Sequence, residues 1–418
     1  MPISVDEFAA EAAGWLAENG EPKPIEMSED ERAWGTGEFS VAVFHALSFE
    51  DEAAVLEDAK RWQQKKATKG YHAIAGSTEF GGLGLSKEHA RAFARLESDY
   101  AVPTRHETFS VTTGLVAPTV QAYGTEEQKE RFVAPFLAAE MLCCQLFSEP
   151  GAGSDLANLS CRAERDGDEW VINGQKVWSS GAQFSEWGEL IARSDPDVPK
   201  HKGMSAFLVP MDHPGVDIRQ IKQMSGGTSF NEVFFDDCRI PDSLRLGPEG
   251  EGWKVALTTL GFERDHSDSG GNRTRAGGSW SQLVATARAM GVTDDPAIRE
   301  DLMNVFIHMR VEHYLNVRAG DLAKEGTPGP EGSLGKLMWT EGMRKMSHVI
   351  SRVLGPKLIA DTGEWGTWEW GEHVLGAPGY RIAGGSDEVQ RNIIGERVLG
   401  LPGEPRVDKG IPWKDVPR

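Results

Sequence analysis

The chain has 418 residues, of which 39% are hydrophobic and 26% charged, a composition typical of a globular protein with two or three domains. Its formal net charge of −20 argues against nucleic acid as a partner, because phosphate binding requires a basic face. No apolar run reaches the roughly 18 residues that a membrane-spanning helix needs, and the first residues lack the basic and apolar regions of a signal peptide. We therefore expect a cytoplasmic protein.

The first part of the chain, to about residue 140, shows helical patterns. Asn19-Gly20 ends the first helix, since glycine suits the position after a helix. Ser48 and Ser86 are expected N-caps, and acidic residues follow Ser48. The expected elements are a helix over 5–18, an extended segment to about 47, and helices over 48–66, from 86, over 106–123 and from about 125.

From about residue 142 the pattern changes to the two-residue alternation of strands. Asp-Gly or Asn-Gly lies between several strands, and Asn173-Gly174 predicts a hairpin turn. No G-x-G-x-x-G follows a predicted strand, so the sequence argues against a Rossmann site. The expected strands begin with the apolar run at 142 and continue over 160–165, 169–172, 175–179, 187–193, 204–210, 216–221 and 231–235.

Helical patterns return from about residue 253, over 253–264, 279–290, 296–323, 332–354 and 386–399. Glycine and proline gather at 326–332 and 376–379, where we expect breaks. The predicted fold is α+β, with an N-terminal helical domain, a central antiparallel β-barrel or sandwich domain, and a C-terminal four-helix-bundle-like domain. The expected boundaries are 1–140, 141–250 and 251–418.

Two stretches of the central part carry polar residues at the ends of strands. The first is LCCQLFSEPGAGSD at 142–155, in which glycines would let a flat or phosphorylated ligand approach the backbone. The second is NGQKVWSSGA at 173–182, in which Trp178 stands beside small polar residues. An ordinary turn and a core tryptophan explain the same residues. The four cysteines, of which Cys143 and Cys144 are adjacent, lack metal-ligand spacing, so we expect reduced thiols and no metal site.

Four segments, in this order and at these separations, resemble the acyl-CoA dehydrogenase family. They are GTEEQK at 124–129, FSEPGAGSD at 147–155, NGQKVWSS at 173–180, and GSDEVQRN at 385–392 followed by ERVLG at 396–400. The resemblance runs from about residue 75 to the C-terminus and implies the family's helical–β–helical fold.

The resemblance implies FAD as the cofactor, bound between the β domain and the C-terminal helices. Ser148 and Ser180 stand where many members carry threonine, and each keeps the hydroxyl. Ser180 would face flavin N5, Trp178 would flank the ring, and Ser154 would contact the pantetheine of CoA. The cofactor residues implied in this way are Gln145, Phe147, Ser148, Trp178, Ser180, Arg273, Ser386 and Gln390.

The catalytic base departs from the commoner family pattern. Many members carry glutamate at the position of Gly384, which has no side chain to accept a proton. Some branches instead place it within Leu-x-x-Glu-Arg, and LGFER at 260–264 matches that form. The resemblance therefore implies Glu263 as the base and Arg264 as a neighbouring substrate contact, while the Gly384 amide would bind the thioester carbonyl. A solvated helix-surface glutamate is the alternative for Glu263, and the lesser base candidates are Asp265, His266 and Asp268.

The implied reaction is α,β-dehydrogenation of an acyl-CoA thioester to the trans-2-enoyl-CoA. A carboxylate takes the α proton, hydride passes to flavin N5, and an electron-transfer flavoprotein is the expected acceptor. We expect a homo- or hetero-tetramer. The region 270–280 lacks the family's Arg-x-x-Phe-Gly segment, so two alternatives stay open: a non-catalytic or half-site subunit of a hetero-oligomer, and a flavin oxidase or monooxygenase of the same fold that acts on a non-CoA substrate.

Overall fold

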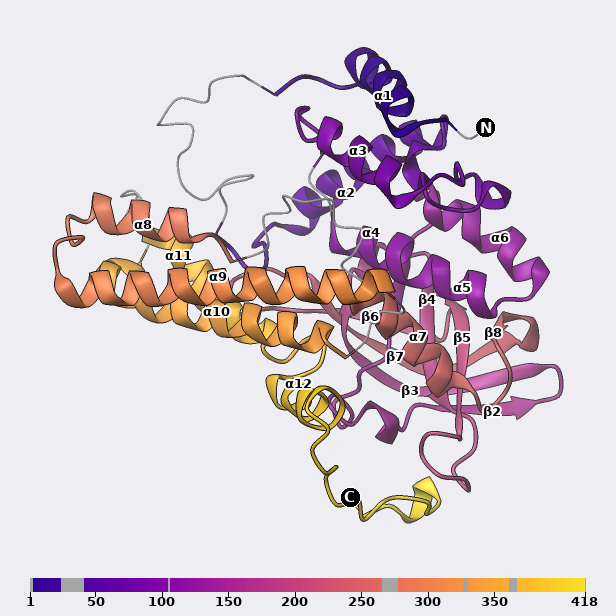
Figure 1. The fold of residues 1–418 in the computed structure, drawn as a ribbon. Coiled ribbons are helices and arrows are strands. Elements are labelled where there is room, and N and C mark those ends of the chain that lie inside the picture. Colours follow the sequence, from indigo (N-terminus) through magenta and orange to yellow (C-terminus); the bar gives the residue numbers. More distant parts are fainter. Residues whose placement is uncertain are drawn as a thin grey trace.

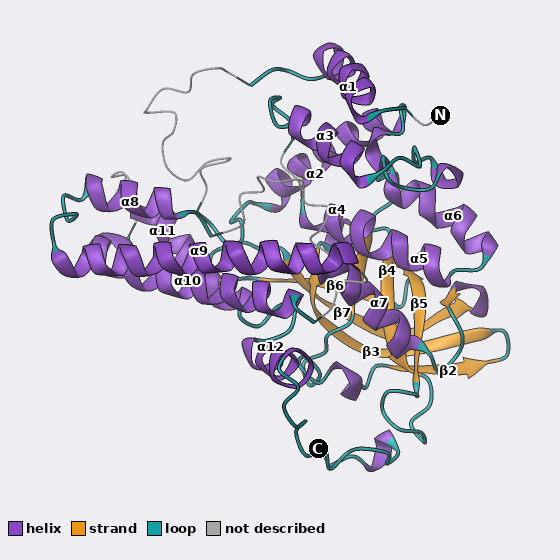
Figure 2. Cartoon of the chain, in the orientation of Figure 1, coloured by secondary structure: helices purple, strands orange, loops and turns teal. Residues whose placement is uncertain are grey.

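A computed structural model describes residues 3–23, 41–103, 106–264, 277–325, 330–360 and 367–417. N-terminal helices, a β-sheet and a bundle of long helices follow one another along the chain (Figure 1). The strands occupy the centre, with the N-terminal helices on one side and the bundle extending away from them (Figure 2). The expected order of helices, strands and helices is confirmed.

The N-terminal helices begin at capping residues, of which Ser48 was expected. Ser4 and Ser48 each accept a hydrogen bond from a backbone amide in the first turn, and Thr125 forms a capping box. Ser86 precedes its helix as expected, but its hydroxyl bonds the His89 ring instead of an amide. The helices are α1 (Val5–Asn19), α2 (Phe49–Ala67), α3 (Lys87–Glu97), α4 (Glu107–Val111), α5 (Ala117–Tyr123) and α6 (Glu126–Leu137).

The expected buried helix over residues 106–123 is continuous but not uniform. A π-helical turn, Thr112–Val116, joins α4 to α5. Within it, Thr112 Oγ1 accepts a hydrogen bond from the Cys143 amide at 2.9 Å. The wider turn is therefore the point at which this helix attaches to the sheet, and helical periodicity in the sequence does not reveal it.

The described strands form one sheet in the order β6-β7-β3-β2-β4-β5-β8, with β1 paired to β4. Most neighbours run antiparallel, as expected, but β1 and β2 each run parallel to β4. The strands are β1 (Cys143–Leu146), β2 (Arg162–Asp166), β3 (Glu169–Ser180), β4 (Trp187–Arg193), β5 (Met204–Pro210), β6 (Val216–Ile221), β7 (Phe230–Pro241) and β8 (Arg245–Leu246).

The prediction of a hairpin turn at Asn173-Gly174 is wrong, because β3 continues through both residues. The pairing of β3 with β7 shifts register between Ile172 and Gly174, and Gly174 has a φ of 150°. A Cβ on Gly174 would lie 2.7 Å from the Cys161 Cα. Asn-Gly therefore forms a bulge at which the neighbouring strand approaches too closely for any side chain.

The C-terminal helices are α7 (Gly252–Arg264), α8 (Trp280–Ala289), α9 (Pro296–Glu325), α10 (Gly332–Leu354), α11 (Thr367–Tyr380) and α12 (Asp387–Ile393). A π-helical turn, Ile394–Val398, continues α12, so the expected helix over 386–399 changes its winding part of the way along.

The break expected at 376–379 is wrong, because these residues belong to α11. Added Cβ atoms on Gly376 and Gly379 would lie 2.7 Å from the Val43 Cβ and 2.6 Å from the Phe44 Cε2. These two glycines therefore allow the segment 41–48 to pack closely against α11. Glycine and proline in the sequence suggest a helix break and do not reveal this packing.

The largest core lies between the sheet and helices α5, α6 and α7, and a second core fills the bundle of α8 to α11. A smaller N-terminal core joins α1 to α3. Among the described residues, no helix combines the length and the apolar character needed to cross a bilayer.

Candidate active site

A buried ion pair joins the loop after β1 to strand β3. Lys176 Nζ lies 2.7 Å from Glu149 Oε1 and donates to the Phe147 carbonyl oxygen at 3.0 Å, and the lysine side chain has no exposed surface. Burial opposes ionisation of Glu149, but Lys176 and the hydrogen-bonding amides of Ser160 and Cys161 together outweigh it and hold the pKa of that carboxyl below its ordinary value. The Val177 amide also donates to the Ser148 carbonyl oxygen. The two polar stretches of the sequence therefore lie side by side.

Trp178 is turned out of strand β3 by an irregularity in the ladder. Its φ is 62°, which is rare for a bulky residue, and the pairing with β7 shifts register between Lys176 and Ser179. The indole is 59% exposed and lies edge-on to Phe230, with ring centroids 5.9 Å apart. The strand thus presents a flat aromatic surface, so the reading of Trp178 as a core residue is wrong.

Ser180 ends β3 against the start of α4. Gly181 follows it with a φ of 62°, and an added Cβ would lie 1.6 Å from the Thr108 Oγ1, so glycine alone fits here. Glu107, the first residue of α4, lies beside the Ser180 hydroxyl. Its side chain is exposed. The sequence did not single it out, because it lies far from the motifs along the chain.

The residues of β1 and β3 fit the FAD expected from the motifs. Gln145 Nε2 is buried and has no hydrogen-bond partner among the described residues. An unsatisfied buried donor costs roughly 1–3 kcal/mol, so a ligand that offers an acceptor there is favoured. The exposed Trp178 ring suits a flat partner, Ser148 is half-buried, and Phe147 packs into the core. A flavin has both an acceptor edge and a flat ring.

The backbone of the glycine turn before α12 is held by a hydrogen bond from the Gln390 side chain. Gly384 and Gly385 have φ values of 63° and 85°, and Gln390 Nε2 donates to the Gly384 carbonyl oxygen at 2.9 Å. Ser386 caps α12 by accepting from the Val389 amide. The Gly384 amide has no acceptor among the described residues, which leaves it able to bind a substrate carbonyl. Gln390 is thus a positioning residue for this turn.

A row of aromatic rings connects the sheet to that turn. Trp178 contacts Phe230, and Phe230 lies 5.3 Å from Phe44, centroid to centroid. Phe44 stacks on Tyr380 at 4.9 Å, and Tyr380 contacts Trp339 at 4.6 Å. Because Tyr380 ends α11 just before the Gly384 turn, the row brings Trp178 and the glycine turn to the same region of the molecule.

Helix α7 is fixed by a buried hydroxyl network. Thr259 Oγ1 lies 3.0 Å from Thr119 Oγ1 on α5 and donates to Glu189 Oε1 on β4 at 2.7 Å. Positions 263 and 264 end α7 one turn later, and helical spacing puts position 263 on the face that Thr259 occupies. The side chains of Glu263 and Arg264 lie outside the described residues. So do three lesser base candidates and one expected cofactor residue: Asp265, His266, Asp268 and Arg273.

Glu189 is expected to make stability depend on pH. Burial raises its pKa from 4.5 to about 8, so the folded protein keeps this carboxyl protonated while the unfolded chain ionises it above pH 4.5. Between pH 5 and 7 its ionisation therefore favours unfolding, and the free energy of unfolding should fall by roughly 2–3 kcal/mol through this residue. Chemical denaturation at both pH values should show that Glu189→Gln removes this loss. An unchanged difference between the two pH values in the variant would contradict the assignment.

A second buried cluster joins the segment 41–48 to α2 and α4. Glu52 Oε1 lies 2.8 Å from His106 Nε2 and 3.2 Å from His45 Nε2. Burial opposes ionisation of Glu52, but the two histidines outweigh it and hold its pKa at about 2. These three residues are close enough to hold a metal ion. However, His106 Nδ1 accepts the Thr108 amide, so Nε2 carries the proton and donates to Glu52. The cluster is a hydrogen-bonded anchor for α4.

Family models match nearly the whole described chain. Residues 41–140 match the acyl-CoA dehydrogenase N-terminal domain, residues 144–238 the middle domain, and residues 250–399 the C-terminal domain. Acyl-CoA dehydrogenase IpdE1 of Mycobacterium tuberculosis (strain ATCC 25618 / H37Rv) is 39% identical over 404 residues, which cover 96% of this chain and 98% of that protein. The mitochondrial short-chain specific acyl-CoA dehydrogenase of Homo sapiens is 30% identical, over 80% of this chain and 82% of its own length.

Solved structures agree with this likeness. The Tcur3481-Tcur3483 steroid ACAD superposes with a TM-score of 0.72 at 28% identity, covering 97% of this chain and 99% of the compared chain. The ChsE4-ChsE5 complex from Mycobacterium tuberculosis gives a TM-score of 0.69 at 25% identity, with 97% and 100% covered. The second is described as a complex of two components, and the first carries a two-part name.

Proposed function

The chain belongs to the acyl-CoA dehydrogenase family, whose members are FAD-dependent oxidoreductases, and we propose that it oxidises the α and β carbons of an acyl-CoA thioester to the trans-2-enoyl-CoA. The observation that carries the proposal is the Lys176–Glu149 attachment of the Ser148 loop to β3. This attachment joins the loop that carries the Ser148 hydroxyl, next to the buried amide donor of Gln145, to the strand that carries the exposed Trp178 indole.

Glu263 is the proposed base. Its position one turn beyond Thr259 puts it on the face of α7 that is fixed against β4. The carboxylate would take the α proton of the thioester, and the Gly384 amide would donate to the thioester carbonyl, which stabilises the charge that develops there. Bound FAD supplies the hydride acceptor for the β carbon. Arg264 is a proposed substrate contact, and Arg273 and Ser386 are proposed cofactor contacts.

The proposal includes the expected surroundings of the enzyme. An electron-transfer flavoprotein is the proposed acceptor of the electrons. The described cysteines are free and buried, which supports a reducing compartment such as the cytoplasm. We keep 1–140, 141–250 and 251–418 as the proposed domain boundaries.

The deciding experiment is a visible spectrum of the purified protein, followed by anaerobic titration with a panel of acyl-CoA thioesters. Bleaching of the oxidised flavin band by one thioester class is the expected result, and it would begin to identify the acyl group. If no FAD is retained even after FAD is added, the protein does not act alone and a partner subunit is required. If FAD is retained but no thioester bleaches it, an oxidase or monooxygenase on a non-CoA substrate becomes the better reading.

A second subunit is proposed to cover one face of α9. Large apolar side chains recur along this helix at spacings of three to five residues and are 42–61% exposed: Met303, Ile307, Val311, Tyr314, Val317 and Leu322. A contiguous apolar stripe of this kind is unfavourable in water and marks an interaction surface. The two-component neighbours favour another chain of this fold as the occupant, in a homo- or hetero-tetramer.

Val311→Asp is expected to reduce the molar mass of the assembled protein, because a charge in a buried apolar interface is costly to desolvate. Light scattering after size exclusion measures the mass. Val407→Asp is the matched control, since Val407 is 86% exposed and lies outside the stripe. The proposal is contradicted if the wild-type protein has the mass of a single chain both when it is purified alone and when it is purified with any partner.

A further inference from the structure

A buried carboxylate directly follows the glycine turn in the chain. Asp387 is the first residue of α12, and only 1% of its side chain is exposed. Arg381 Nε donates to Asp387 Oδ2 at 2.8 Å, and Thr340 Oγ1 donates to Asp387 Oδ1 at 2.8 Å. Lys336 Nζ lies 3.4 Å from the same Oδ1. The carboxylate is therefore held by three side chains, two from α10 and one from the residue that precedes the turn.

These contacts close the turn at both ends. The Asp387 amide donates to the Arg381 carbonyl oxygen at 2.9 Å, so the two residues share one backbone and one side-chain hydrogen bond. Gly384 and Gly385 lie between them, both with positive φ. Glycine has the widest choice of backbone conformation, so two in succession do not fix the direction of an amide by themselves. Asp387 supplies the fixed ends of the turn, and Thr340 ties them to α10.

Asp387 holds its partners as an anion. Burial opposes its ionisation, but Arg381, Thr340 and Lys336 together outweigh burial and keep the pKa of this carboxyl below its ordinary value. Asparagine has the same shape but only one acceptor oxygen, so at this position its amide N–H groups would face one of the donors. The side chain is thus replaceable in volume but not in hydrogen bonding.

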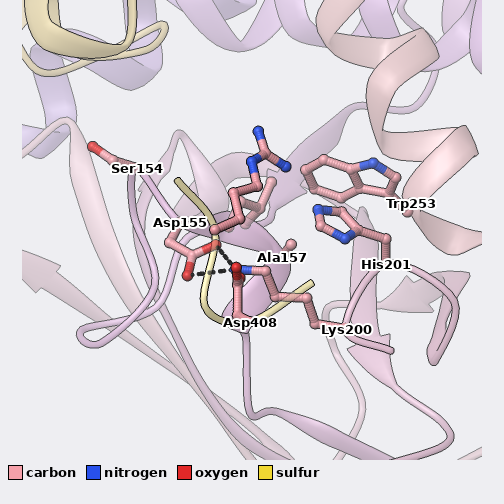
Figure 3. A pocket seen from close by; sticks show the side chains of 9 residues that line it. Ser154, Asp155, Ala157, Lys200, His201, Trp253 and Asp408 are labelled. Atoms are coloured by element: carbon pink, nitrogen blue, oxygen red, sulfur yellow. Dashed lines mark hydrogen bonds and ion pairs between the residues drawn. The ribbon is translucent and has the colours of Figure 1, made fainter. Parts of the chain in front are cut away.

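A second lysine–aspartate cluster provides a comparison. Lys200 joins Asp155 to Asp408 beside a pocket of about 240 Å³ (Figure 3). Both of those carboxylates are partly exposed, so water can replace either contact. Asp387 is almost completely buried, and a lost partner there leaves a polar group unsatisfied. We therefore expect the cluster around Asp387 to constrain its loop more tightly than the cluster around Lys200 does.

We propose that Asp387 is a positioning residue for the dehydrogenation, because it holds the Gly384 amide in the direction that donates to the thioester carbonyl. The inference rests on the proposed function, which makes that carbonyl the ligand of the turn. Asp387 acts through the backbone and does not contact the substrate. A donor that is aimed in advance stabilises the charge that develops on the carbonyl oxygen without reorganisation during the reaction. Asp387 therefore affects the binding of a carbonyl and the rate of reaction, and not the binding of the rest of the ligand.

Amide hydrogen exchange of the FAD-loaded protein tests the hold on the turn without any substrate. In Asp387→Asn, the peptide that contains residues 381–387 is expected to exchange about tenfold faster than in the wild type, because the turn opens more often. Glu388→Gln is the matched control, since it removes the same charge from the next residue of α12, where the side chain is exposed. The control should change the exchange less than about twofold. Equal exchange in Asp387→Asn and the wild type would overturn the proposal.

Ligands with and without a carbonyl distinguish positioning from support of the fold alone. One ligand is a 2-enoyl-CoA, which has the thioester carbonyl, and the other is the S-alkyl-CoA thioether of the same chain length, which has none. Asp387→Asn is expected to weaken calorimetric binding of the enoyl-CoA about tenfold and of the thioether less than about twofold. With the saturated acyl-CoA, the rate of flavin reduction should fall about a hundredfold. Equal losses for the two ligands would rule out the positioning role.

Thr340 provides a second test, which also decides the matter if Asp387→Asn does not retain FAD. Thr340→Val keeps the volume and removes one donor to Asp387, whereas Thr340→Ser keeps the hydroxyl. The valine variant should lose affinity for the enoyl-CoA selectively, and the serine variant should restore it. A valine variant that binds both ligands as the wild type does would contradict the inference.

Failure of the proposed function has a different result. In that case the wild-type protein binds neither ligand, and no acyl-CoA reduces its flavin. The hydrogen exchange of residues 381–387 still decides whether Asp387 holds the turn, because that measurement requires no substrate.

Discussion

Glu263→Gln is expected to bind FAD normally and to lose nearly all flavin reduction by acyl-CoA. The amide keeps the size of the carboxyl but cannot accept the α proton, and loss of a positioned base typically lowers a rate by roughly 10²- to 10⁴-fold. Rapid-mixing spectroscopy under anaerobic conditions measures the decay of the oxidised flavin band. An intact flavin spectrum in the variant would show that the fold is preserved, so the slower decay would report on the chemistry.

The matched control is Glu251→Gln, the same change at the other end of α7. Glu251 is about half exposed and pairs with Lys254 on the helix surface, so its loss should leave the rate unchanged. A Glu263→Gln variant that reduces flavin at the wild-type rate would contradict the assignment. The base would then be sought among Asp265, His266 and Asp268, which follow α7 directly.

The fold was predictable wherever local signals and tertiary packing agree. The cap at Ser48 marks the start of a helix that the structure confirms, because a capping hydroxyl satisfies an amide within its own turn. Asn173-Gly174 and the glycines of α11 gave wrong predictions for a shared reason. At Gly174 and Gly379 the missing side chain makes room for a distant segment, Cys161 in one case and Phe44 in the other. Local sequence cannot distinguish that use of glycine from a turn.

The candidate site, like the fold, was predictable from the sequence only in part. The motifs indicated Ser148 and Trp178, and the structure brings their loops together, but the exposed setting of Trp178 depends on a strand irregularity that no periodicity encodes. Glu189 was missed, because a carboxyl becomes informative only when burial raises its pKa, and burial is a property of the assembled fold.

Lys176 was also missed, and it has the largest expected effect on stability. A lysine in a strand usually faces water, yet this side chain has no exposed surface, and Glu149 beside it is only 5% exposed. Lys176→Met keeps most of the volume but leaves the Glu149 carboxylate buried without its cation. Breaking a buried pair from one side costs about 3–5 kcal/mol, since the remaining charge stays desolvated. Chemical denaturation of the FAD-loaded protein should show this loss, together with weaker retention of FAD as the Ser148 loop is released from β3.

Two further variants show whether the cost belongs to the pair. Adding Glu149→Gln to Lys176→Met removes the unpaired charge, so the double variant should be more stable than Lys176→Met alone. Lys129→Met breaks an exposed pair with Glu126 on α6 and should cost less than about 1 kcal/mol. If Lys176→Met costs no more than Lys129→Met, the buried pair does not hold the loop after β1 in place. In that case the hydrogen bond from the Val177 amide and the surrounding packing alone position the Ser148 hydroxyl and the Trp178 indole.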